Sequence, residues 1–269
     1  MDESLNLSRA RLETFLACQR RFYLRYRARL PWPAAPLDPQ QETAAIRGQQ
    51  FHLLLQRRFL NLDVDPDAIA DEQLRNWWDA FVEQGPALPN GRYLPELQLS
   101  VPVGRCVLSG RFDLVVLGQT AGGAPFAHVF DWKTGSPQTA DALRQAWQTR
   151  LYLALLAESR GALLKNGQIL DPDQAALTYW YVSAPHSPRT LRYSRAAHAQ
   201  NWAEVRQVVA AMQTQLARAD WPLTDDWGQC RACAYQVICR RQAAGGAAGA
   251  WDADAEADTA DLTLDPHTP

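Results

Sequence analysis

The sequence lacks three features that would place the chain in other functional classes. No apolar run approaches the roughly 20 residues that a membrane-spanning helix needs, so we expect no membrane partner. No G-x4-G-K-[ST] phosphate-binding loop occurs, so any ATP-driven unwinding would come from another chain. No signal peptide is recognisable at the start, and we therefore expect a cytoplasmic protein.

Lysine is also scarce, although the chain is rich in basic residues. Of the 27 basic residues, only Lys133 and Lys165 are lysine and the others are arginine. Arginine is a broad fork that keeps its proton, whereas the lysine ammonium is a compact point charge that can lie beside a water and a metal ion. The use of lysine at position 133 therefore marks it as a candidate functional residue.

Two carboxylates accompany Lys133 in an expected β-hairpin. Residues 107–117 and 126–133 are rich in β-forming residues, and turn-forming residues lie between them. Asp131 and Lys133 share one face of their strand, and Asp113 can reach that face from the neighbouring strand. Such a group can hold Mg²⁺ or Mn²⁺, orient a water and offset charge on a phosphate. Taken alone, the motif fits a surface hairpin with an ion pair equally well.

The five cysteines fall into two classes. Cys106 lies in an apolar strand region and is typical of a buried thiol. The other four suit a tetrahedral zinc site or a [4Fe–4S] cluster, and they are Cys18, Cys230, Cys233 and Cys239. The spacing favours the cluster, because zinc sites more often use two closely spaced pairs and only one such pair occurs. The odd number of cysteines and the lack of a signal peptide disfavour disulfides.

Two expected helices carry further candidates. The helix over 43–60 has an apolar stripe of Phe51, Leu55 and Phe59. His52 lies off that stripe, and its imidazole could join the two aspartates at one ion, although an ordinary half-buried histidine fits too. In the helix over 140–160, Gln148 and Tyr152 lie side by side and could order the lysine, a water or the nucleic-acid backbone. The alternative is a packed tyrosine and a solvated glutamine.

Residues near the N-terminus combine arginines with aromatic side chains. Arg20, Arg21 and Arg25 lie among Phe15, Phe22 and Tyr26. Arginines with aromatic rings suit a path for single-stranded nucleic acid. The near-helical spacing of the rings indicates that they are core residues and that only the arginines face the strand. A solvated helix face remains the alternative.

Acidic residues gather at the other end of the chain. The last 19 residues contain six acidic residues and no lysine or arginine, so residues 1–250 carry a net charge of +4. We therefore expect a folded domain over 1–242 and a disordered acidic tail over 243–269. Glu96, on an expected strand ahead of the hairpin, is a further acidic candidate.

These motifs together resemble the PD-(D/E)XK nuclease superfamily, and within it the iron–sulfur members of the RecB-like branch. The chain is similar to the AddB C-terminal nuclease domain and to four-cysteine CRISPR-associated exonucleases over residues 5–241. The matching pieces, in the family's order, are Leu7–Phe15 with Cys18, Gly48–His52, Gly110-x-x-Asp113, Asp131-x-Lys133-Thr134-Gly135, Gln148-x3-Tyr152 and the cysteine trio. The family usually has proline where this chain has Gln19 and often tyrosine where it has Trp132, but no catalytic group is lost.

The resemblance implies an α/β, restriction-endonuclease-like fold, with a central mixed sheet flanked by helices. It joins the N- and C-terminal segments at a four-cysteine site that holds a [4Fe–4S] cluster, with zinc as the alternative. It also implies that His52, Asp113 and Asp131 bind Mg²⁺ or Mn²⁺, that Lys133 positions the attacking water, and that Gln148 and Tyr152 support the site.

The implied activity is metal-dependent DNA cleavage. We expect an exonuclease acting on single-stranded ends in repair, recombination or CRISPR-type DNA processing, with a helicase or CRISPR-type protein as a possible partner. One alternative is a non-catalytic DNA-binding or scaffold subunit of a helicase–nuclease complex. Another is a zinc protein with no nuclease role.

Overall fold

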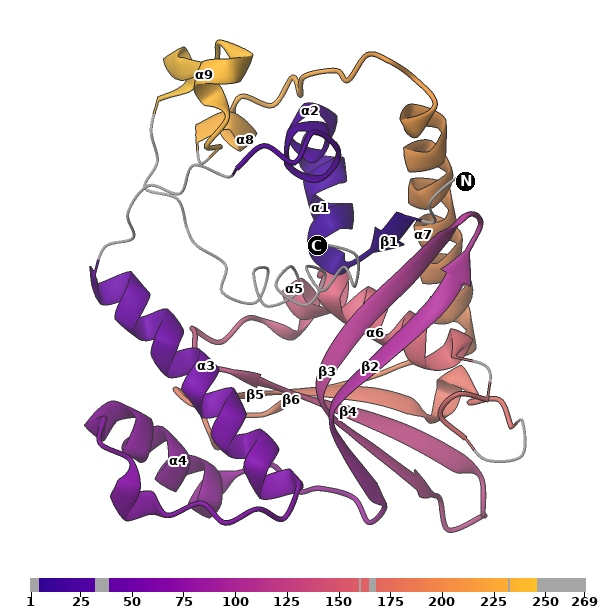
Figure 1. Ribbon diagram of the computed structural model, residues 1–269. Helices are drawn as coiled ribbons and strands as arrows, with labels where there is room; N and C mark the ends of the chain where they lie inside the picture. The colour runs from indigo at the N-terminus through magenta and orange to yellow at the C-terminus, as the bar shows by residue number, and fades with distance from the viewer. Residues whose placement is uncertain (1–4, 32–38, 160, 165–167, 232, 246–269) are drawn as a thin grey trace, which may run out of the picture. The chain divides into compact units, whose positions relative to one another are not determined.

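The computed structural model describes residues 5–31, 39–159, 161–164, 168–231 and 233–245 (Figure 1). The chain divides into two compact units. The sheet unit comprises residues 44–101 and 109–204, and the terminal unit comprises the chain up to 43, residues 102–108 and the chain from 205 onwards. Most of the predicted acidic tail over 243–269 lies outside the described residues.

A mixed β-sheet forms the centre of the sheet unit. Its strands are β2 (Arg92–Val103), β3 (Cys106–Gln119), β4 (Pro125–Lys133), β5 (Ala175–Tyr181) and β6 (Arg189–Arg192). β3 and β4 pair antiparallel, β4 and β5 parallel, and β5 and β6 antiparallel. The predicted hairpin and the predicted mixed sheet are therefore confirmed. β6 was not predicted, because four residues with a single leucine give almost no periodic signal.

Helices cover both faces of this sheet near the end of β4 (Figure 1). They are α3 (Pro39–Phe59), α4 (Glu72–Gln84), α5 (Ala140–Gln145) and α6 (Trp147–Glu158). The first half of α7 (Arg195–Leu216) lies beside α6, where Arg150 donates a hydrogen bond to Asn201. Short 3-10 turns lie at Pro66–Ala68 and Pro172–Gln174. The part of the chain that the structure describes contains no helix with the length and apolar character needed to cross a membrane.

The prediction of one continuous helix over 140–160 was wrong. Ala146 takes an extended conformation, with φ −60° and ψ 134°, and this ends α5 and starts α6 in a new direction. Alanine is an excellent helix former, so nothing local predicts the break. The cause is packing: nine of the twelve residues of α6 are buried, so the position of this helix follows its neighbours rather than α5.

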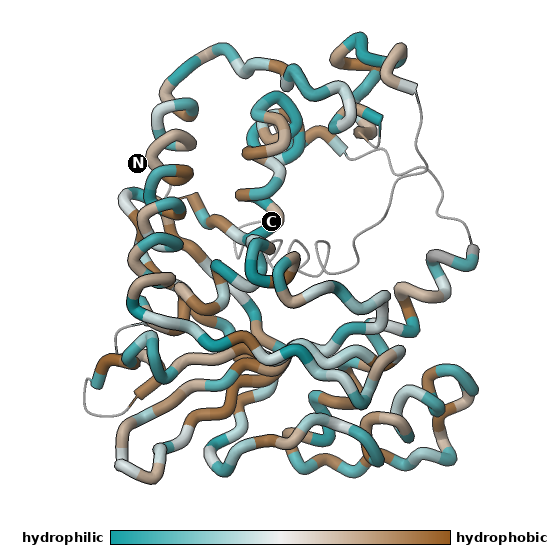
Figure 2. Tube along the Cα trace, turned by 180° about the vertical axis from the view of Figure 1, so that it is seen from behind, coloured by the Kyte–Doolittle hydropathy of each residue, from teal (hydrophilic) through white to brown (hydrophobic). Residues whose placement is uncertain are grey.

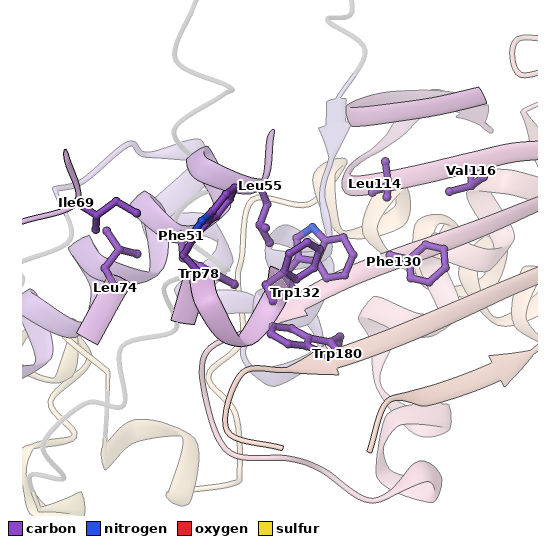
Figure 3. Close-up of a cluster of buried hydrophobic side chains, with 11 residues drawn as sticks. Phe51, Leu55, Ile69, Leu74, Trp78, Leu114, Val116, Phe130, Trp132 and Trp180 are labelled. Atoms are coloured by element: carbon purple, nitrogen blue, oxygen red, sulfur yellow. The ribbon is translucent and has the colours of Figure 1, made fainter. Parts of the chain in front are cut away.

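An aromatic core packs α3 and α4 against one face of the sheet (Figure 3). Trp132 of β4 lies opposite Trp180 of β5 in the strand register. The Phe81 ring meets both indoles edge-on, with ring centroids 5.1 Å and 5.3 Å away. Because side chains alternate along a strand, burial of Trp132 in this core sends Asp131 and Lys133 to the opposite face. Figure 2 shows that the central strands are largely hydrophobic.

The terminal unit is built mainly from short helices. β1 (Leu5–Leu7) pairs parallel with Cys106–Leu108, and α1 (Arg9–Ala17), α2 (Gln19–Phe22) and the π-helical turn Tyr23–Arg27 follow. The second half of α7 is followed by α8 (Gly228–Arg231), α9 (Gln236–Cys239) and a 3-10 turn at Gln242–Ala244. Phe15 and Phe22 are buried, with ring centroids 5.6 Å apart, which confirms the core prediction for these two rings. Tyr26, the third predicted core ring, is half-buried.

Candidate active site and cysteine site

Asp113 connects strand β3 to two neighbouring elements. Its Oδ2 accepts a hydrogen bond of 2.8 Å from the backbone N–H of Trp132 in β4. Its Oδ1 lies 3.4 Å from Nδ1 of His52 in α3. The strand pairing thus fixes one carboxylate oxygen, and the other is presented to the imidazole.

Glu96 joins this pair from strand β2. Ligand atoms of His52, Glu96 and Asp113 all lie within 4.8 Å of one another. Glu96 has a left-handed backbone conformation, with φ 51°, inside a strand. Such a kink costs roughly 1–3 kcal/mol and re-aims a side chain out of the regular strand alternation. Its carboxylate also pairs with the guanidinium of Arg111, with Oε2 and Nε 3.3 Å apart.

The donor chemistry of this group fits a hard divalent cation. One imidazole nitrogen and two carboxylates are ligands that Mn²⁺ accepts readily, and the carboxylates also suit Mg²⁺. Ligand atoms about 2.1 Å from a shared octahedral ion lie about 3–4 Å apart, and the distance of 3.4 Å between His52 Nδ1 and Asp113 Oδ1 falls in that range. The sequence offered Glu96 only as an acidic residue on an earlier strand. Its place at the site depends on the kink in β2.

Asp131 and Lys133 form a second, buried group next to this one. The Asp131 side chain is 3% exposed, and its Oδ2 lies 2.9 Å from the Lys133 ammonium. The Gln148 side chain donates a hydrogen bond of 2.7 Å to Asp131 Oδ1. Gln148 is itself buried, so the alternative of a solvated glutamine was wrong. The carboxylate therefore has one neutral donor and one cationic neighbour.

Tyr152 packs one helical turn beyond Gln148. Its ring centroid lies 4.6 Å from that of Phe112, and the residue is buried. A Cβ at Gly110 would come within 2.8 Å of Leu155 Cδ1 and 3.5 Å of the Tyr152 ring. The glycine of the Gly-x-x-Asp motif thus allows α6 to approach β3 closely. The ring of Tyr152 is held by packing, as the simpler of the two sequence interpretations expected.

Two residues beside the lysine were missed by the sequence analysis. Tyr179 lies opposite Asp131 in the register of β4 and β5, and the Lys133 ammonium lies 5.9 Å from the centre of its ring. Burial, reinforced by the Asp131 charge, holds the pKa of Tyr179 well above its ordinary value. Its hydroxyl and that of Thr149 are hydrogen-bonded at 2.8 Å. Only the pairing of β4 with β5 could have revealed this neutral tyrosine.

The four predicted cysteine ligands line one cavity of the terminal unit. They are Cys18, Cys230, Cys233 and Cys239, whereas Cys106 is not among the lining residues. Burial raises the pKa of the Cys233 and Cys239 thiols. Cys18 also caps α2, because its Sγ accepts a hydrogen bond of 3.4 Å from the backbone N–H of Arg21. Four thiols around one cavity are a donor set suited to zinc or to an iron–sulfur cluster.

The arginines proposed for nucleic-acid binding are all half-buried. Arg21 lines the cysteine cavity, and the Nε atoms of Arg20 and Arg21 are enclosed by protein. The Arg25 guanidinium lies over the ring of Tyr26, 5.4 Å from its centre. A role for these three residues in nucleic-acid binding therefore stays a prediction.

Comparisons with known proteins gave matches over most of the chain. A family model described as "PD-(D/E)XK nuclease superfamily" matches residues 6–102 and 90–240. One similar solved structure, titled "Crystal structure of SSO0001", is 14% identical, with 89% of this chain and 87% of that chain covered. Its TM-score of 0.34 is too low to support a conclusion about fold or function. No curated protein matches. Since the family model spans nearly all of the chain that carries the two sites, this protein belongs to the PD-(D/E)XK nuclease superfamily.

Proposed function

We propose that this protein is a divalent-metal-dependent DNA nuclease that hydrolyses phosphodiester bonds. The observation that carries the proposal is the juxtaposition of two groups in the sheet unit. His52, Glu96 and Asp113 offer ligands to one cation, and Asp131 with Lys133 lies directly along the chain from the Trp132 N–H that binds Asp113. A cation site beside a fixed ammonium suits a reaction that builds negative charge on a phosphate.

The metal ligands are divided between three elements. His52 from α3, Glu96 from β2 and Asp113 from β3 would hold Mg²⁺ or Mn²⁺. Asp131, which the sequence also predicted as a metal ligand, is not a member of this group and instead contacts Lys133 and Gln148. When bound, the cation would act as a Lewis acid and lower the pKa of a bound water. Hydrolysis forms a bond between the water oxygen and phosphorus and breaks the bond to one ester oxygen, which leaves with a proton.

Lys133 is the residue best placed to meet the developing charge. Its side chain is 16% exposed and is held between the Asp131 carboxylate and the Tyr179 ring. In this setting the ammonium can orient a water or stabilise the phosphate oxygens. Gln148 fixes the orientation of Asp131, and Tyr152 fixes α6 against β3, so both act as positioning residues.

The finer assignment rests on the sequence resemblance to the RecB-like branch. It supports an exonuclease acting on single-stranded ends, in repair, recombination or CRISPR-type processing, with a helicase or CRISPR-type partner. It also supports a [4Fe–4S] cluster on Cys18, Cys230, Cys233 and Cys239. The spacing of the cysteines favours the cluster over zinc, and the shared cavity is consistent with either centre.

The decisive experiment is cleavage of end-labelled single- and double-stranded DNA by anaerobically purified protein, with Mg²⁺, Mn²⁺ or EDTA. Asp113→Asn and Glu96→Gln test the metal group, and Glu83→Gln, an exposed glutamate on α4, is the matched control. We expect metal-dependent cutting that Asp113→Asn abolishes, that Glu96→Gln weakens with a higher metal requirement, and that Glu83→Gln leaves intact. Absence of cutting by folded, metal-supplemented protein would overturn the proposal in favour of the scaffold role.

A further inference from the structure

Among the described residues that line the cysteine cavity, only Arg21 and Arg241 have permanently charged side chains. The remaining lining residues are uncharged, and they are Leu223, Thr224, Gln229, Tyr235 and Gln236. The lining thus combines four sulfur ligands with two permanent positive charges and no carboxylate.

Several guanidinium nitrogens in this region have no acceptor. Arg20 Nε, Arg21 Nε and Arg241 Nη1 are buried, and none has a hydrogen-bond partner among the described residues. A buried polar group without a partner costs about 1–3 kcal/mol, and a charged one costs more. Donors left in this state beside a cavity lined by four thiols are placed to donate hydrogen bonds to a group bound in that cavity.

Local structure holds both cavity arginines close to a cysteine. Arg21 lies in the first turn after Cys18, whose Sγ accepts from the Arg21 backbone N–H. At the other end, Arg240 has a left-handed conformation, with φ 55°, that ends α9 directly after Cys239. This turn returns Arg241 to the cavity, where its guanidinium stacks over Trp227, 4.1 Å from the ring centre. The stacking limits the freedom of an otherwise flexible side chain.

We infer that Arg21 and Arg241 are the charge partners of a metal–thiolate centre, and that their guanidinium groups donate hydrogen bonds to its sulfur atoms. Four thiolates around Zn²⁺ or a [4Fe–4S]²⁺ core leave a net charge of about −2. Two cations in the lining offset that charge. The inference rests on the proposed cysteine centre but not on nuclease activity, and it gives Arg21 a role different from nucleic-acid binding.

The test uses the full-length protein purified anaerobically, with Arg21→Gln, Arg241→Gln and the double variant. Iron, sulfide and zinc content are measured first, followed by the reduction potential of an iron-containing centre and the rate of metal loss to a chelator. We expect each variant to lower the reduction potential and to speed metal loss about tenfold or more, as for loss of one hydrogen bond to a charged acceptor. Arg→Lys at either position should give an intermediate rate of metal loss, because lysine keeps the positive charge but lacks the planar guanidinium group with its several donors.

Arg231→Gln is the matched control, since Arg231 lies between two cysteine ligands but is exposed and does not line the cavity. Circular dichroism identifies variants that fail to fold. Where a glutamine variant fails to fold, the lysine variant at the same position supplies the rate of metal loss and the reduction potential. Metal loss and potential equal to wild type in the double variant would overturn the inference. So would an equal effect of Arg231→Gln, or a wild type that carries neither iron nor zinc at the cysteines. DNA cleavage is not among the readouts, so failure of the nuclease proposal would be recognised separately.

Discussion

The carboxylate site and the cysteine site are constructed in opposite ways. Most residues of the carboxylate site lie between positions 96 and 152, and the register of β3 and β4 positions the aspartates and the lysine. The cysteine site joins Cys18 to residues more than 200 positions later. The carboxylate site therefore follows mainly from the pairing of neighbouring strands. The cysteine site brings together distant segments, and closing such a long loop in an unfolded chain costs on the order of 5 kcal/mol.

The largest effect should come from breaking the cysteine site. In the proposed cysteine centre, Cys230→Ala would remove part of a link between distant segments, and closing that loop is worth on the order of 5 kcal/mol, comparable with the whole stability of many domains. We expect colourless, poorly soluble protein, measured by iron content and by the midpoint of urea unfolding. Cys106→Ala, which removes a thiol outside the cavity, should keep the metal. A well-folded and fully active Cys230→Ala protein would contradict a structural role.

Replacing Lys133 should damage the other site alone. Loss of a preorganised charge stabiliser typically slows an enzyme about 10²–10³-fold, so Lys133→Ala should lose nearly all cleavage while DNA binding and cysteine-bound metal stay at wild-type levels. Lys133→Arg should not restore the rate, because the broad, planar guanidinium group cannot take the position of the compact ammonium group between Asp131 and Tyr179. Undiminished cleavage by either variant would exclude the proposed role of the ammonium.

A smaller effect is expected from the glutamine that orients Asp131. Gln148→Met keeps the volume but removes the 2.7 Å hydrogen bond to a buried carboxylate. Loss of a hydrogen bond to a charged group costs about 1.5–3 kcal/mol, which corresponds to about a 10- to 100-fold slower cleavage step. Single-turnover kinetics would measure it, with Gln145→Met, at the exposed end of α5, as the control. Equal rates in both variants would show that Asp131 needs no such support.

An effect of similar size concerns the acid sensitivity of the sheet unit. His128 of β4 is hydrogen-bonded to Thr178 at 2.7 Å, and burial lowers its pKa to about 4. Between pH 6.5 and pH 4 the unfolded chain binds more protons at this position than the folded protein does. The contribution of His128 to the free energy of unfolding therefore has its full value above pH 6.5 and falls as the pH drops. We expect a loss of about 2 kcal/mol by pH 4, after allowance for partial solvent screening.

His128→Gln tests this prediction, because an amide can keep the bond to Thr178 but does not titrate. Urea unfolding of the metal-loaded protein across this pH range should show a shallower loss of stability in the variant. An identical slope in the two proteins would assign the acid sensitivity to other groups, such as the cysteine centre.

Several elements were predictable because their signals are local. Two runs of β-forming residues separated by turn-forming residues gave the hairpin of β3 and β4, and a helical apolar stripe gave α3 with Phe51 and Leu55 in the core. The break at Ala146 and strand β6 were not predictable, because neither has a local signal. Both depend on what the segment packs against or pairs with.

The sequence alone determined which chemical groups the protein has and which of them share a strand face. Asp131 and Lys133 point away from Trp132 because alternation is a property of any extended chain. Only the tertiary structure decided which groups meet across elements. The kink in β2 brought Glu96 to His52 and Asp113, the docking of α6 gave Gln148 to Asp131, and the turn after α9 returned Arg241 to the cysteines. These meetings depend on burial and strand pairing between distant segments, which the spacing of residues along the chain does not encode.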